Sequence, residues 1–181
     1  DLARDSQRAW KELAQAAGLE LQVERAAKTQ VILDQYLERI TTRKMSELQD
    51  QFVKYFKVLA RKQHLVQSVY IDPQTFQVTL FGENQVVIPK VDLSAGEKQL
   101  YAMALLWALR TVSGRTLPII MDTPMGRLDT DHRQSLLENF FPGAAHQVII
   151  LSTDTEIDTI TFGHLRDEIS HAYRLEFNED K

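Results

Sequence analysis

The feature that most constrains this chain is a helix-start pattern, Ser94-x-x-Glu97, placed directly before the longest apolar run of the sequence, residues 100–109. In such a capping box the serine hydroxyl accepts from the amide three residues later, and the glutamate carboxylate accepts from the serine amide. Gly96 is unusual here, because glycine in a helical turn costs up to about 1 kcal/mol relative to alanine. Two interpretations are open: a capped helix with an incidental glycine, or a helix N-terminus that a phosphate approaches closely.

Residues 1–62 are expected to be helical, because they contain no proline and a single glycine, Gly18, at which we expect a break. From residue 33 onward apolar side chains recur every three or four positions, which is typical of one helix face. A helix of about 35 residues beginning near Glu24 would be ~50 Å long, more than a small domain buries. We therefore expect a coiled-coil arm; a long helix packed on its own domain is the alternative. The apolar positions are Leu33, Leu37, Ile40, Met45, Leu48, Phe52, Phe56 and Leu59.

Residues 63–181 alternate between strand and helix patterns, which predicts an α/β fold and a second domain over this range. A hairpin over residues 65–71 and 76–81, with a third strand at 86–88, precedes an all-round apolar and therefore buried helix over 95–112, which Ser113-Gly114 ends. Fully apolar stretches at 117–122 and 147–151 predict buried strands, and residues 169–177 a closing strand. Thr130 is expected to cap a helix that Pro142-Gly143 end, and Thr155 to cap another.

The composition restricts the class of protein. Hydrophobic residues make up 44% and charged residues 25% of the chain, as in folded soluble domains. The absence of cysteine excludes disulfides and thiolate metal sites. No signal peptide is recognisable, and a ten-residue apolar run is too short to span a bilayer, so we expect a cytoplasmic protein without a membrane partner. Because the chain begins at Asp1 inside a helical pattern, we expect a piece of a longer protein.

Three polar segments, residues 94–98, 122–129 and 152–156, adjoin the buried helix and strands. We expect them to converge, because ligands of open α/β sheets bind at the carboxyl ends of the strands. Asp122 ends an apolar strand and could hold Mg²⁺, directly or through water, or could instead cap the next turn. There is no G-x-S-x-G or H-E-x-x-H pattern, and the five histidines lack metal-ligand spacing. Residues 154–158 lack the glycine and distal glutamate of a calcium loop.

Three motifs resemble those of ABC-type ATPases, in order and spacing. Residues 93–99 (Leu-Ser-Ala-Gly-Glu-Lys-Gln) resemble the signature motif, residues 119–122 (Ile-Ile-Met-Asp) the Walker B strand, and residues 126–129 (Gly-Arg-Leu-Asp) the D-loop. A long helix leading into the signature half resembles SMC-like ATPases, in which coiled coil divides the nucleotide domain into two lobes. More narrowly, residues 94–102, 121–129 and 146–156 resemble the C-terminal part of DndD, the ATPase of bacterial DNA phosphorothioation systems.

The resemblance implies the C-terminal lobe of an ABC/SMC-like ATPase head with a long N-terminal coiled-coil arm, using ATP and Mg²⁺. No G-x-x-x-x-G-K-[ST] pattern occurs, so the Walker A loop would lie in an N-terminal lobe, and this chain alone would not hydrolyse ATP. Two heads would form a homodimer around two ATP molecules, with Asp122 serving Mg²⁺ and Asp129 at the seam. The implied nucleotide-binding residues, which face the γ-phosphate held by the other head, are Ser94, Ala95, Gly96, Glu97 and Lys98.

Two positions depart from the ABC pattern. Thr123 stands where a glutamate usually polarises the attacking water, and its hydroxyl is not a base near neutral pH. Thr153 stands where many members have a histidine. Either another carboxylate acts instead, with Asp129, Asp154 and Glu156 as candidates, or hydrolysis is slow. We expect slow turnover.

The resemblance predicts an ATPase that acts on DNA in phosphorothioate modification, associated with the nucleoid and with other DNA sulfur-modification proteins. Residues 1–62 carry 12 basic and nine acidic side chains and residues 63–181 carry nine and 16, so phosphate contacts by the arm would be non-specific and salt-dependent. The alternatives are a coiled-coil ATPase of DNA repair or phage defence, or a slow or non-hydrolysing ATP-gated clamp. An α/β domain without a nucleotide role would require the three motifs to occur in this order by coincidence.

Overall fold

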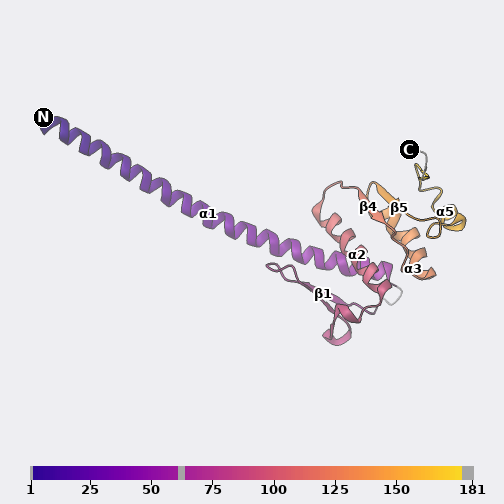
Figure 1. Ribbon diagram of the computed structural model, residues 1–181. Helices are drawn as coiled ribbons and strands as arrows, with labels where there is room; N and C mark the ends of the chain where they lie inside the picture. Colours follow the sequence, from indigo (N-terminus) through magenta and orange to yellow (C-terminus); the bar gives the residue numbers. More distant parts are fainter. Residues whose placement is uncertain (1, 61–63, 177–181) are drawn as a thin grey trace. The chain divides into compact units, whose positions relative to one another are not determined.

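The structure, a computed structural model, describes residues 2–60 and 64–176, except for the side chains of residues 2, 3, 5, 9 and 12–17. The chain divides into two compact units, Asp1–Lys44 and Met45–Lys181. The elements in order are α1 (Leu2–Leu59), β1 (Ser68–Ile71), β2 (Val78–Phe81), η1 (Glu83–Gln85), β3 (Val87–Ile88), η2 (Lys90–Asp92), α2 (Ala95–Ser113), β4 (Ile119–Asp122), α3 (Thr130–Ser135), η3 (Leu136–Phe140), α4 (Phe141–Gly143), β5 (Val148–Leu151) and α5 (Thr159–Leu165) (Figure 1).

Helix α1 continues through Gly18, so the break expected there is wrong. Its apolar stripe has two environments. In the first unit Leu33 and Leu37 are 54% and 59% exposed, whereas in the second unit Phe52 and Phe56 are fully buried. The same periodic pattern thus forms part of a packed core over its last turns and an exposed apolar face before them. The unit boundary falls within the helix, and a domain boundary at residues 62/63 stays a prediction.

Strands β1, β2 and β3 form an antiparallel sheet in that order, which confirms the predicted hairpin and its short third strand. Ser68 pairs with Phe81, and Leu80 pairs with Ile88. The hairpin turn is closed by the Asp72 carboxylate, which accepts the amide of Thr75 at 2.7 Å and that of Gln74 at 2.8 Å. These backbone bonds favour the ionised carboxyl and lower the pKa of Asp72.

Helix α2 begins after Ser94 and ends at Gly114, as the capping signals predict. Gly114 has φ +63°, the left-handed conformation that glycine adopts without a steric penalty. One face is buried through Leu100, Met103, Ala104, Trp107 and Ala108. The expectation that α2 is buried all round is wrong, because Leu106 and Leu109 are 39% and 48% exposed.

We expect alanine substitutions at two glycines to change the stability of the protein in opposite directions. Gly114→Ala lowers the free energy of unfolding by about 1 kcal/mol, because the new Cβ meets no atom but φ +63° is strained for alanine. Gly18→Ala is the matched control: it also has open space around it, sits in a right-handed helix, and raises helix stability by about 0.5–1 kcal/mol. Thermal unfolding followed by circular dichroism measures both, and a stabilising Gly114→Ala would contradict the conformational explanation.

Strands β4 and β5 are parallel and in register, with Ile120 opposite Ile149 and Asp122 opposite Leu151. Ile119 is buried, but Ile120 is 63% and Leu151 is 47% exposed. The expectation of fully buried strands is therefore wrong for one face. Because side chains alternate along a strand, Ile120, Ile149 and Leu151 share that exposed face with Asp122. A parallel sheet is normally covered on both faces, so this one has an apolar surface without a covering layer among the described residues.

Helix starts after residue 129 differ from the expected ones. Asp129, not Thr130, caps α3. The helical path runs through the π-turn η3 into α4, which ends at Gly143, so the end predicted at Pro142-Gly143 is confirmed. Asp158, not Thr155, caps α5 by accepting the Thr161 amide at 2.8 Å, which lowers the pKa of Asp158. Residues 169–176 form no strand; residue 177 lies outside the described residues.

The core of the second unit joins the end of α1 to α2 and to the α3–α4 path. Tyr55 and Trp107 stack with ring centroids 4.0 Å apart and planes at 7°, and the Tyr55 hydroxyl pairs with the Thr111 hydroxyl at 3.0 Å. Trp107 meets Phe140 edge to face at 5.4 Å. This aromatic packing fixes α2, and therefore its N-terminus, relative to the rest of the second unit.

Candidate functional site

The N-terminal turn of α2, residues 94–98, has the capping box that the sequence predicts. The Ser94 hydroxyl accepts from the Glu97 amide at 3.2 Å, and the Glu97 carboxylate accepts from the Ser94 amide at 2.9 Å. Ser94 and Ala95 are exposed, so this end of the helix is open to a ligand. The Lys98 ammonium donates to the Val91 carbonyl at 3.2 Å. A capped, exposed helix start with a lysine in its first turn is a suitable environment for an anion.

Gly96 is explained by a close backbone approach within the chain. A Cβ at this position would lie 3.3 Å from the Arg127 carbonyl oxygen and 3.7 Å from the Leu128 side chain. The first turn of α2 therefore lies directly against residues 127–128. The interpretation of Gly96 as a position for phosphate approach stays a prediction, and the packing gives the glycine an independent reason.

Asp122 ends β4 and is exposed, on the same side of the sheet as Leu151. The next residue, Thr123, donates its amide to the Leu151 carbonyl at 2.8 Å and has φ +46°. A β-branched residue with a positive φ is strained by of order 1–3 kcal/mol, and such strain is found preferentially at functional sites. The chain thus turns sharply at Thr123, directly after Asp122.

Residues 123–125, which follow β4, are held by side chains from two other elements. The Gln99 amide nitrogen, on α2, donates to the Pro124 carbonyl, and the Met125 amide donates to the Glu156 carboxylate, which follows β5. Glu156 is 4% exposed and is the one buried charged side chain in the described part of the chain. From the sequence, Gln99 belongs to a motif without a role of its own and Glu156 is one of the candidate bases. No sequence signal indicated its burial.

The other predicted site residues are exposed. Asp129 caps α3, accepting the His132 amide at 2.9 Å and lying 2.8 Å from the His132 ring nitrogen Nδ1. Thr153 pairs its hydroxyl with that of Thr155 at 3.0 Å, and its carbonyl accepts the Glu156 amide at 3.1 Å. Asp154 lies in the same turn. The three expected polar segments thus lie close together. Gly96 packs on Arg127, and hydrogen bonds join Gln99 to Pro124 and Met125 to Glu156.

Among the side chains that the structure describes, no three His, Asp or Glu cluster so as to hold a metal ion without further ligands. Magnesium is commonly held by one or two carboxylates together with substrate phosphates, and the exposed Asp122 fits that requirement. None of the helices in the described part of the chain combines the length and apolarity needed to cross a membrane.

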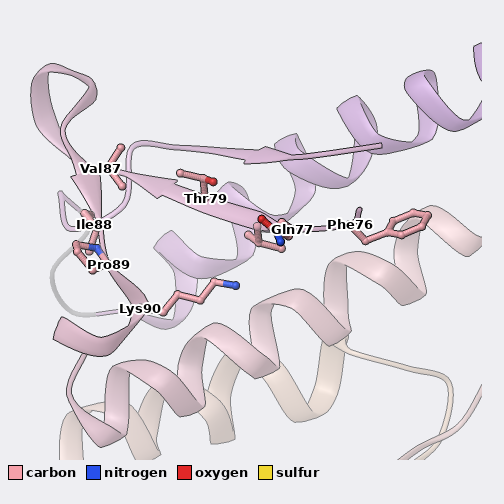
Figure 2. A pocket seen from close by; sticks show the side chains of 8 residues that line it. Phe76, Gln77, Thr79, Val87, Ile88, Pro89 and Lys90 are labelled. Carbon is pink, nitrogen blue, oxygen red and sulfur yellow. The ribbon is translucent and has the colours of Figure 1, made fainter. Parts of the chain in front are cut away.

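A shallow pocket opens on the antiparallel sheet (Figure 2). It is lined from β2 and β3 and the residues flanking them, and the Lys90 ammonium at its rim lies 5.3 Å from the centre of the Tyr101 ring. None of the predicted site residues lines this pocket, so it supplies no second candidate for the nucleotide site.

Comparison with known proteins supports the fold. No protein-family model and no curated relative matches the sequence. Among solved structures, an SMC head bound to the C-terminal winged-helix domain of ScpA matches with a TM-score of 0.52 and 14% identity, over 68% of this chain and 38% of that one. A second structure, from a study of ATP-driven dimerisation and DNA-stimulated activation of SMC ATPases, matches with a TM-score of 0.52 and 15% identity. The match covers 70% of this chain and 76% of that one. The chain spans less than half of the first neighbour and has the fold of the C-terminal lobe of an SMC head.

Proposed function

We propose that this chain is the signature-bearing half of an SMC-like ATPase, in which ATP joins two heads and hydrolysis releases them. One observation carries the proposal: the capped, exposed start of α2 packs through Gly96 on residues 127–128, in the segment that begins with Asp122. Ser94 and the amides of Gly96 and Glu97 would contact the γ-phosphate of the other head's ATP. Asp122 would serve Mg²⁺ in its own head, and Asp129 would lie at the seam.

A Walker A lobe is the proposed partner of the exposed sheet face. Ile120, Ile149 and Leu151 expose 63%, 39% and 47% of their surface beside Asp122. Further strands or helices would be expected to cover such a face, because exposed apolar surface is unfavourable in water. A lobe placed there would bring its phosphate-binding loop to the strand end that carries Asp122, as the proposed Mg²⁺ role requires.

Slow turnover follows from the residues at the proposed hydrolytic position. Thr123 cannot accept a proton near neutral pH, and the Glu156 carboxylate is buried against the Met125 amide. A long-lived ATP-bound dimer suits a gate or clamp, since ATP would favour the closed state until it is cleaved. DNA, contacted through its phosphates by the arm, is the proposed cargo. Phosphorothioate modification is the favoured pathway, with DNA repair or phage defence as the alternatives.

The proposed function is tested by ATP turnover of the full-length protein. We expect slow Mg²⁺-dependent hydrolysis, and we expect Asp122→Ala to lower its rate by about 100-fold or more, because the metal contribution is several kcal/mol. Asp131→Ala, which removes an exposed acid at the start of α3, is the matched control and leaves the rate unchanged.

Single-turnover measurement separates the outcomes. Turnover by wild type that survives Asp122→Ala would contradict the proposed Mg²⁺ role. A fast rate that Asp154→Ala abolishes would contradict slow turnover, and no ATP binding at all would contradict the proposal as a whole.

A further inference from the structure

Two side chains distant in sequence hold the short loop after β4, residues 123–125. Gln99 Nε2 donates to the Pro124 carbonyl across 25 positions of sequence, and the Met125 amide donates to Glu156 Oε1 across 31. One anchor belongs to the second turn of α2 and the other to the turn after β5. The loop is therefore attached by hydrogen bonds to α2, one residue beyond the polar segment 94–98, and to the polar segment 152–156.

Glu156 and Gln99 each bury an oxygen atom that has no hydrogen-bond partner, which is energetically unfavourable. Glu156 is 4% exposed, and its Oε2 atom is buried without a hydrogen-bond partner. The Oε1 atom of Gln99 is also buried without one. A buried carboxylate with half of its acceptor capacity unused is unfavourable, so its place here requires a compensating role. The loop that it holds begins with Thr123, whose φ of +46° is strained for a β-branched residue.

We propose that Gln99 and Glu156 are positioning residues that clamp residues 123–125 and transmit movement of α2 to the end of β4. This inference rests on the proposed function. A phosphate bound at Ser94 would displace the first turn of α2. Gln99 lies in the next turn, and its side-chain amide, which donates to the Pro124 carbonyl, carries this displacement to the loop. Glu156 fixes the other end of the loop, so the displacement is taken up at Thr123 and Asp122. Occupancy of one nucleotide site would thereby reach the metal residue of the other.

The clamp itself is tested by hydrogen exchange of the Met125 amide in this chain. We expect Glu156→Met, which removes the acceptor but keeps an unbranched side chain, to speed exchange at Met125 by about tenfold or more. Glu156→Gln keeps an acceptor oxygen and is expected to restore most of the protection. The Ile119 amide, which donates to the Gln147 carbonyl at 3.0 Å outside the loop, serves as an internal reference. Unchanged exchange at Met125 in Glu156→Met would overturn the clamp.

Transmission is tested in the full-length protein with ATP. We expect ATP to change exchange at Met125 in wild type, and we expect Gln99→Met to abolish that change while two heads still associate with ATP. The matched control is Gln134→Met, which removes an exposed glutamine paired with Glu138 at 2.7 Å on α3 and η3. An undiminished ATP response in Gln99→Met would overturn the transmission role. If wild-type heads do not associate with ATP, the proposed function fails, whereas the exchange result in the isolated chain still decides the clamp.

Turnover distinguishes positioning from catalysis. A positioning Glu156 predicts that kcat falls about 10–100-fold in Glu156→Met, with little change in KM, and largely recovers in Glu156→Gln. Equal loss in both variants would instead make the carboxylate a proton acceptor and overturn the positioning role.

Discussion

Ser94→Arg is expected to abolish ATP-dependent association of two heads in the full-length protein. The arginine side chain would fill the space in front of the α2 N-terminus where the γ-phosphate of the opposing head is proposed to bind. It would also remove the hydroxyl that accepts the Glu97 amide at 3.2 Å. Analytical ultracentrifugation with and without ATP measures the association.

Loss of the cap must be separated from loss of the phosphate contact, since capping alone contributes about 1 kcal/mol to the stability of a helix. Ser94→Asp makes that separation, because aspartate caps helices as well as serine does but repels a phosphate. We expect Ser94→Asp to unfold at the wild-type temperature and to fail in ATP-dependent association. Ser113→Arg, the same change in charge and size at the other end of α2, is expected to associate normally. Association of Ser94→Arg heads at wild-type affinity would exclude the proposed contact.

Trp107→Ala is expected to lower the free energy of unfolding by about 3–5 kcal/mol, the largest stability change that we predict. The indole is 8% exposed, stacks on Tyr55, meets Phe140 edge to face, and would lie 3.1 Å from a Cβ built on Gly143. Its removal leaves a cavity where the end of α1, α2 and the α3–α4 path meet. Urea unfolding followed by circular dichroism measures the change.

Trp10→Ala is the matched control, because the other tryptophan of the chain is 74% exposed on α1. We expect it to change the free energy of unfolding by less than about 0.5 kcal/mol. A loss at Trp107 no larger than that at Trp10 would show that the aromatic stack does not hold α2 in place.

Local sequence signals predicted those features in which the interacting residues are close in sequence. The Ser94–Glu97 capping box, the Gly114 stop and the hairpin between residues 71 and 76 each depend on side-chain or backbone preferences over a few residues. The same kind of signal failed where two residues near a helix start could act as its N-cap. Asp129 caps α3 instead of Thr130, and Asp158 caps α5 instead of Thr155. Gly18 did not break α1, because one glycine costs too little to interrupt a long helix.

Hydrophobic patterns located strands and helix faces but not what covers them. The stripe along α1 keeps the same spacing before and after residue 45, yet Leu37 is exposed and Phe52 is buried, because packing partners surround only Phe52. Ile120 and Leu151 belong to runs as apolar as any core strand and are exposed for the same reason. Burial depends on which neighbours are present, and a pattern along one chain does not contain them.

By itself, the sequence determined the α/β fold, the start and end of the helix that carries Ser94, and the order of the motifs around Asp122. Only the tertiary structure decided that Gly96 packs on the Arg127 carbonyl, that Thr123 is strained, and that Glu156 is buried against the Met125 amide. Capping depends on atoms three residues apart, which a sequence displays directly. The loop clamp depends on atoms 25 and 31 residues apart, and these meet only when the helix and both strands have packed together.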